Sequence, residues 1–380
     1  MSRVKIETLT PVHIGSGNFF SNSELVEFQN ADGRFIGIIS PEKILKLVGE
    51  DNIGNWVTYI QNDNSVKDFL NQFAPNARPK DYIKRAVLSF GSGSTLKECL
   101  HDGSGKPYIP GSSIKGAIRT AVLASLVDVT RGLEKEIDKT NPKKTDRNGN
   151  PIKKASATSV ENSLFALSRD KAPNSEFFRF IKIGDAYFEK DCEIALKEIN
   201  LNIRISHEEL TDKSKAQLVE FIAQEETSEF ELKIDKRLSD WSAHKESTVR
   251  VRAVPDEIAN INMLFYLINC HTKSLLDFEI DYWNNVEQMG ADNYISGLEE
   301  IRDEIDLDNK ESCVLRIGHG SGWRFITGAW TEKLGNFTEL VVPCSRPNND
   351  KKYSEYDFPK SRRIDEDSDV FGFVKLTKID

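Results

Sequence analysis

The sequence is poor in residues that form disulfides or bind metals. The five cysteines are scattered and form no Cys-x-x-Cys pair; they lie at positions 99, 192, 270, 313 and 344. An odd, dispersed set is typical of reduced thiols, which excludes a disulfide framework and argues against a structural zinc site. The six histidines offer no alternative, because His207-Glu208-Glu209 lacks the second histidine of a zinc-protease motif. We therefore predict neither a metal nor a cofactor.

Long apolar runs are also absent. The longest one, Ile261–Ile268, contains Asn262 and is far shorter than the roughly 20 residues that cross a bilayer. The first residues lack the apolar core of a secretory signal. We therefore expect a cytoplasmic protein with no membrane partner.

The charge balance excludes a broad basic surface. The formal net charge is −9 over 380 residues, so any nucleic-acid site must be local. Residues 131–154 hold eight Lys or Arg against four Asp or Glu, whereas residues 299–311 hold seven acids against two bases. The basic stretch Lys135–Ser156 has almost no apolar residues, which predicts a mobile loop. We interpret it as a linker, with RNA contact as the less favoured alternative, and expect domains 1–156 and 157–380.

The residues that are present indicate a globular protein. Hydrophobic residues make up 38% of the chain and charged residues 29%. Apolar residues at every second position predict strands, and apolar residues at helical spacing predict helices. Asp185 interrupts one predicted strand, where a turn residue is more typical than a catalytic carboxylate. The expected strands are Arg3–Leu9, Leu25–Gln29, Arg34–Ser40, Tyr108–Ile109, Phe177–Phe188, Glu193–Ile205 and Glu229–Ile234, and the expected helices are Glu42–Val48, Pro255–Leu276 and Asn293–Ile305.

The stretch Pro107–Leu126 organises the chain. It predicts a short strand, a glycine turn, and a helix capped by Ser112 or Ser113. Helix N-termini favour acidic residues, but this first turn has none and contains Lys115 and Gly116 instead. The composition fits a phosphate held by free amides and Lys115. It fits equally well an ordinary capped helix whose cation points to water.

Two loops are rich in glycine. Gly15 and Gly17 follow the first predicted strand; their amides suit an anion or, as we favour from the residues alone, a hairpin turn. Residues 318–322 have glycine at every second position but lack the spacing and the helix of a dinucleotide-binding loop. Trp323, next to that loop, fits either a base-stacking residue or a buried one.

Four regions of the sequence resemble the RAMP superfamily of CRISPR-associated RNA-binding proteins. Within it, the chain is similar to the fifth Csm subunit of type III-A effector complexes. In that family the C-terminal glycine loop packs against the first loop and touches guide RNA. The similar segments are Leu-Thr-Pro-Val-His-Ile-Gly-Ser-Gly at 9–17, Pro-Gly-Ser-Ser-Ile-Lys-Gly-Ala-Ile-Arg at 110–119, the glycine loop at 318–322, and Pro-Lys-Ser-Arg-Arg-Ile with Phe-Gly-Phe-Val-Lys-Leu after 358.

The resemblance implies an α+β fold of two tandem ferredoxin-like, RRM-type domains with glycine-rich loops and helical insertions. It implies a non-catalytic subunit that caps the 3′ end of the CRISPR RNA and supports maturation of that end in antiviral defence. The implied partners are CRISPR RNA, the neighbouring backbone RAMP subunit, the small helical subunit and a host 3′ nuclease. The residues expected to bind RNA are His13, Gly15, Ser16, Gly17, Gly111, Ser112, Ser113, Lys115, Gly116, Arg119, Gly318, His319, Gly320, Ser321, Gly322, Lys360, Arg362 and Arg363.

Two other functions stay open at this point. Related RAMP proteins cleave RNA with histidine or aspartate, and His13 and His319 are the pair that this sequence offers for metal-independent cleavage. We weigh them as contacts rather than catalysts, because the six histidines form no repeated acid–base pattern. Alternatively, the acidic helix Asn293–Ile305 would recruit a nuclease, which would make the chain a protein adaptor.

Overall fold

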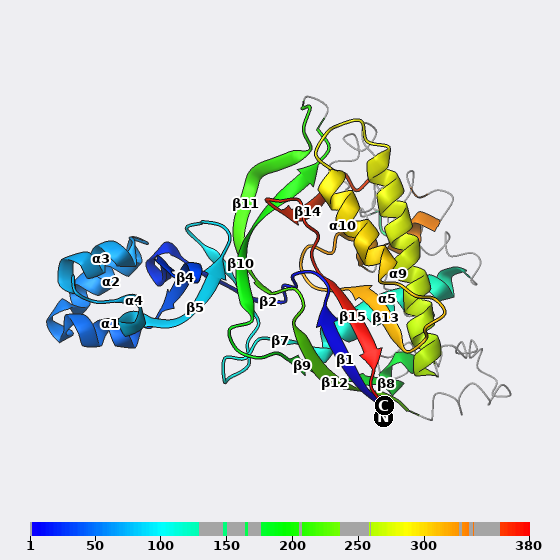
Figure 1. The fold of residues 1–380 in the computed structure, drawn as a ribbon, viewed down its shortest axis with the longest axis horizontal. Helices are drawn as coiled ribbons and strands as arrows, with labels where there is room; N and C mark the ends of the chain where they lie inside the picture. The colour runs from blue at the N-terminus through cyan, green and yellow to red at the C-terminus, as the bar shows by residue number, and fades with distance from the viewer. Residues whose placement is uncertain are drawn as a thin grey trace.

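The computed structural model describes residues 2–128, 147–149, 164–165, 176–204, 207–235, 258, 260–326, 329–333, 337 and 358–380. Most of Lys135–Ser156, and the boundary at residue 156, lie outside these residues and stay predictions. Two sheets with their helices form the main body, and a lobe of helices projects from one end (Figure 1). The two chain ends lie side by side, since the Ile379 amide donates to the Arg3 carbonyl over 2.9 Å (Figure 1). No helix in the described residues is long and apolar enough to cross a membrane.

A five-stranded antiparallel sheet joins the two ends of the chain. Val4 and Ile6 on its first strand are fully buried, which confirms the predicted alternation. They share a buried cluster with Ile118 of α5 (Gly111–Asp128) and Leu264 of α9 (Ile261–Asn284), the two helices over this face. In spatial order the strands are β13 (Ser312–Arg316), β15 (Phe373–Lys378), β1 (Ser2–Thr8), β12 (Thr227–Ile234) and β8 (Ile181–Ile183).

The order of these elements along the chain is that of a ferredoxin-like unit. Apart from the edge strand β13, the strands of this sheet and the two helices over it follow in the order β1, α5, β8, β12, α9 and β15, a βαββαβ sequence. The last strand lies beside the first, and the first beside β12. This unit therefore takes residues from the whole length of the chain.

A second, mixed sheet is inserted into this unit. β10 and β5 are parallel, as are β11 and β6, whereas the remaining pairs are antiparallel. Both sheets contain strands from before and after residue 156, and the second of the two tandem ferredoxin-like domains is not confirmed. In spatial order the strands are β2 (Gly15–Phe20), β6 (Leu96–Cys99), β11 (Thr211–Ile222), β10 (Glu193–Asn202), β5 (Ile83–Ser89), β4 (Gly33–Ile39) and β3 (Leu25–Asn30), with β14 (Ser361–Asp365) also paired to β10.

The projecting lobe has a small core of its own. Trp56 and Phe69 are buried there with ring centroids 4.9 Å apart. The Ser40 side chain caps the first helix of the lobe, as expected for a helix with proline at its start. The lobe contains α1 (Pro41–Val48), α2 (Ile53–Gln61), α3 (Val66–Phe73) and α4 (Pro79–Tyr82). The remaining elements are α10 (Asp292–Asp303), the ribbon of β7 (Tyr108–Ile109) and β9 (Ala186–Tyr187), and 3₁₀ turns at Asn22–Glu24, Glu50–Asn52, Phe177–Phe180, Trp323–Phe325 and Ala329–Lys333.

Several predicted boundaries are wrong. The helix α5 begins at Gly111, and the amides of Ser113 and Ile114 bond to the Pro110 carbonyl, so neither Ser112 nor Ser113 is its N-cap. The predicted strand Phe177–Phe188 opens with a 3₁₀ turn, because its first phenylalanines pack into the core. Residues 15–18, interpreted as part of a loop, belong to the strand β2.

Candidate nucleic-acid interface

Three segments that are far apart in the sequence interlock at the junction of the two sheets. The Gly372 amide donates to the Pro11 carbonyl and the His319 amide donates to the His13 carbonyl, each over 2.9 Å. Gly318 has φ +76°, and a Cβ there would lie 2.4 Å from the His13 oxygen. Only glycine permits this approach. The expectation that the two glycine loops pack together is confirmed.

His13 lies inside this junction. Its side chain is fully buried, and Nδ1 donates to the Glu220 carbonyl over 2.6 Å. Burial lowers the pKa of His13 to about 4, so the ring is neutral at neutral pH. Nε2 is the nitrogen that could accept a hydrogen bond; it has no partner among the described residues and faces Gly15.

His319 lies beside His13, with ring centroids 5.5 Å apart in an edge-to-face arrangement. Nε2 is 2.5 Å from Oε2 of Glu198, and Nδ1 is 3.1 Å from Nζ of Lys97. Because an ammonium group donates, Nδ1 accepts from Lys97 and the Nε2 proton is directed at Glu198. Both ring nitrogens of His319 are therefore engaged, although a quarter of the side chain (25%) is exposed.

Glu198 is the buried centre of this group. Oε1 accepts a hydrogen bond from Gln217 over 2.8 Å and lies 2.8 Å from Nη1 of Arg363. Burial alone would raise the pKa of Glu198, but the hydrogen bonds from His319 and Gln217 and the charge of Arg363 hold it below its usual value. We call Lys97, Glu198, His319 and Arg363 the glycine-loop cluster. It contains two cations, Lys97 and Arg363, and one carboxylate, Glu198.

The serines of the glycine loops hold those loops in place. Ser16 Oγ donates to Glu98 over 2.9 Å, and Ser321 Oγ donates to the Gly318 carbonyl over 2.7 Å. The glycines around them have left-handed backbone angles, with φ +91° at Gly17 and +82° at Gly320. These hydroxyls therefore stabilise the loops.

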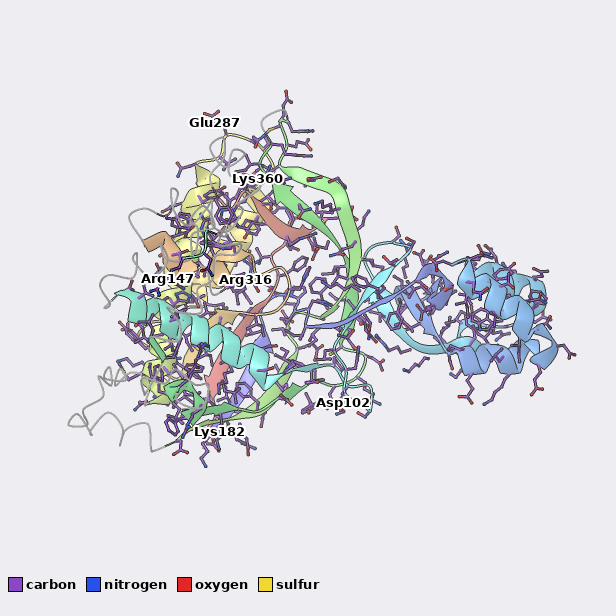
Figure 2. The ribbon with its side chains drawn as sticks, turned by 180° about the vertical axis from the view of Figure 1, so that it is seen from behind. Asp102, Arg147, Lys182, Glu287, Arg316 and Lys360 are labelled. Atoms are coloured by element: carbon purple, nitrogen blue, oxygen red, sulfur yellow. The ribbon has the colours of Figure 1, made fainter. Side chains whose placement is uncertain are left out.

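The two adjacent arginines of β14 have different environments. Arg362 is 3% exposed, and its donors bond to Glu279 and to backbone carbonyls. The RNA contact predicted for Arg362 does not fit this placement, because a buried, fully paired guanidinium cannot meet a phosphate. Arg363 faces the other side of the strand and keeps a third of its side chain (33%) exposed. Lys360, labelled in Figure 2, lies near the end of β10 and donates to the Ile203 carbonyl.

The start of α5 matches the prediction only in part. Asp185 accepts a hydrogen bond from the Gly111 amide over 2.7 Å, so a carboxylate of the protein already binds this helix end. Arg119 lies over the Phe165 ring and pairs with Glu176 over 2.8 Å. Gly111 and Arg119 therefore do not offer free groups to a phosphate. Ser112 and Gly116 are exposed, and Ser113 and Lys115 are half-buried.

Lys97 and Glu198 were not among the site residues predicted from the sequence. Both lie within strands, and strand charges usually point to solvent. The signal for Glu198 was its place in β10, where half of the residues of Glu193–Asn202 are apolar. For Lys97 the sequence gives no such signal.

One other group in the described residues has the geometry of a metal site. His101, Glu193 and Glu220 place their ligand atoms within 4.8 Å of one another. Arg85 binds both oxygens of Glu220 and lies 3.9 Å from Glu193, and His101 Nε2 is 2.5 Å from Glu193. Because Arg85 and His101 already contact both carboxylates, this group is satisfied without a metal ion.

Sequence relatives and solved structures agree on the kind of protein. A CRISPR system Cms protein Csm5 from Methanocaldococcus jannaschii is 32% identical over 194 residues, which cover 48% of this chain and 42% of that protein. The Csm5 of Streptococcus thermophilus is 28% identical over 148 residues, covering 32% of this chain and 37% of the relative. The chain therefore matches less than half the length of either relative.

Two solved structures share the fold. One is a chain from the cryo-EM structure of a Csm-crRNA-target RNA ternary complex in a type III-A CRISPR-Cas system, with a TM-score of 0.68, 20% identity, and 99% and 100% coverage of the two chains. The crystal structure of T.onnurineus Csm5 has a TM-score of 0.60 and 18% identity, with 97% and 99% coverage. The model of the RAMP superfamily matches residues 5–325, including both glycine loops and the start of α5. The chain therefore belongs to the RAMP superfamily.

Proposed function

We propose that this chain is the fifth-subunit equivalent of a type III-A Csm effector complex, in which it binds the 3′ region of the CRISPR RNA. In this proposal it caps the RNA beside the repeated backbone subunit and supports maturation of the 3′ end. Relatives named Csm5 and the shared fold with a chain of a Csm-crRNA-target RNA complex support the assignment. Contacts with the small helical subunit and a host 3′ nuclease belong to the same proposal.

The observation that carries the proposal is the glycine-loop cluster. Lys97 and Arg363 outnumber the one carboxylate, Glu198, and lie beside interlocked loops in which Gly15, Gly17 and Gly318 are exposed. Cations and backbone amides are the groups that bind phosphate and position RNA without reading its sequence. A small site of this kind suits a chain with a net charge of −9, which would repel RNA elsewhere.

The same geometry supports a non-catalytic role over the endoribonuclease alternative. General acid–base cleavage needs two groups within hydrogen-bond reach of the 2′-hydroxyl and the leaving oxygen. His13 is fully buried, and both nitrogens of His319 are bound by Glu198 and Lys97. The adaptor alternative stays a prediction: α10 packs through Tyr294 and Leu298 and directs its acids outward.

The cluster is tested by replacing Lys97 with Gln. We expect this change to weaken binding of a labelled single-stranded guide RNA about tenfold at low salt, and to reduce the slope of log affinity against log salt by about 0.7. Lys84→Gln is the control, because Lys84 is exposed on β5 of the same sheet. Fluorescence anisotropy over a salt series measures both. Equal effects of the two changes would exclude the cluster from the RNA interface. If the unchanged chain, alone or in the complex, shows no salt-sensitive RNA binding, the proposed function is overturned.

The start of α5 is tested by replacing Gly116 with Ala. A Cβ at Gly116 would meet nothing within 4 Å, so alanine should stabilise the helix by up to about 1 kcal/mol. If the RNA backbone approaches this exposed turn, as we propose, the added methyl group weakens RNA binding while it raises the melting temperature. Effects of opposite sign distinguish contact from misfolding. A more stable variant with unchanged affinity would exclude this turn from the interface.

A further inference from the structure

An exposed aromatic ring lies on the same face as the glycine-loop cluster. Phe19 on β2 is 56% exposed and is directly opposite Lys97 in the antiparallel pairing of β2 and β6. Directly opposed residues of an antiparallel pair project their side chains to the same face of the sheet. Lys97 points to His319 on that face. The Phe19 ring therefore flanks the cation that contacts His319.

Packing does not account for this ring. The next residue, Phe20, projects to the opposite face, where it packs against a buried cluster that includes Leu96 and Leu218. Phe20 and its neighbours therefore anchor the strand without Phe19. The pairing also shifts register by two residues between Gly15 and Phe19, so that Phe19, instead of Gly17, lies opposite Lys97.

We propose that Phe19 is a stacking platform for a nucleobase of single-stranded RNA whose backbone is bound by Lys97 and Arg363. This inference rests on the proposed function and adds a contact to the base. Aromatic rings bind unpaired bases of any sequence by stacking, and they occur beside cations that follow the backbone. A protein partner is less suited to this place, because Phe19 adjoins Gly17, polar Asn18 and the charged cluster.

The test uses the full-length chain and a single-stranded RNA that contains 2-aminopurine, a base whose fluorescence is quenched by stacking. Phe19→Ala should weaken binding about tenfold and abolish the protein-dependent quenching, with the salt slope unchanged. Phe19→Trp should retain both binding and quenching, because tryptophan also stacks. The matched control is Phe90→Ala. Phe90 directly follows β5, is 65% exposed and is not paired with Lys97.

The outcomes separate this inference from the proposed function. If Phe19→Ala binds and quenches like the unchanged chain, or if Phe90→Ala loses as much affinity, stacking on Phe19 is overturned while RNA binding stands. If the unchanged chain binds no RNA, the function fails and the inference with it. The melting temperature of each variant shows whether a loss of RNA binding is caused by unfolding. If Phe19→Ala unfolds, Phe19→Trp provides the test, because a folded Phe19→Trp variant that does not quench 2-aminopurine overturns the proposal.

Discussion

Replacing Glu279 with Ala is expected to lower the free energy of unfolding by about 3–5 kcal/mol, the largest effect of any single change proposed for this protein. Glu279 lies on α9 with its side chain 1% exposed. It is 3.0 Å from Arg324 and 2.8 Å from Arg362, and these arginine side chains are 3% and 2% exposed. Without Glu279, two guanidinium groups stay buried with Glu332 as the carboxylate that still contacts one of them. An uncompensated buried charge costs more than the lost contact.

The buried carboxylate is held in its charged form. Burial favours the neutral acid, but the charges and hydrogen bonds of Arg362 and Arg324 hold the pKa of Glu279 below its ordinary value. A matched exposed pair is Glu304 with Lys375, 2.8 Å apart, with Glu304 46% exposed. Glu304→Ala should cost less than 1 kcal/mol, because water screens an exposed pair. Urea unfolding of both variants measures the difference, and equal losses would contradict the interpretation.

Replacing His13 with Asn is expected to change how stability depends on pH. The pKa of His13 is about 4 in the folded chain against 6.5 when exposed, because burial disfavours the charged ring. Between these values the unfolded chain binds more protons than the folded one, so stability rises with pH and is lost as the pH falls from 6.5 toward 4. The loss attributable to His13 is about 3 kcal/mol.

Asparagine can keep the hydrogen bond to the Glu220 carbonyl but does not titrate. The free-energy difference between the unchanged chain and His13→Asn should therefore shift by about 3 kcal/mol from neutral pH to about pH 4. Asp365 acts in the opposite sense, since burial raises its pKa to about 6, but it is common to both proteins and cancels in the difference. Denaturant unfolding across this range measures the shift. Parallel pH profiles for the two proteins would show that His13 is not the titrating group.

Local pattern predicted local structure well. The alternation in the first strand, the two strands observed as β3 and β4, and the helix after Pro41 are all present, because each is set by neighbours a few residues away. The long strand β11 was not predicted. Its first half, Thr211–Gln217, is polar, and it is a strand because β10 and β6 pair with it.

The burial and pairing of the cations could not be predicted from the sequence. Arg362 and Arg363 are adjacent in a strand, so they must face opposite sides, but which side is buried depends on what packs there. Arg362 meets Glu279 of a helix that is distant in the sequence, and Arg363 meets Glu198. Lys115 and Arg119, one helical turn apart, looked alike in the sequence. Arg119 is paired with Glu176, and Lys115 lies over Phe178 without a close carboxylate in the described part of the chain.

The sequence by itself determined the superfamily, the positions of the glycine loops and most of the strands and helices next to them. Only the tertiary structure decided which cations remain accessible, because burial and ion pairing depend on contacts between residues that are tens to hundreds of positions apart. His13 and His319 illustrate both parts. Their glycine-rich surroundings were evident from the sequence, whereas the burial of one ring and the pairing of the other by Lys97 and Glu198 follow from the way the two sheets meet.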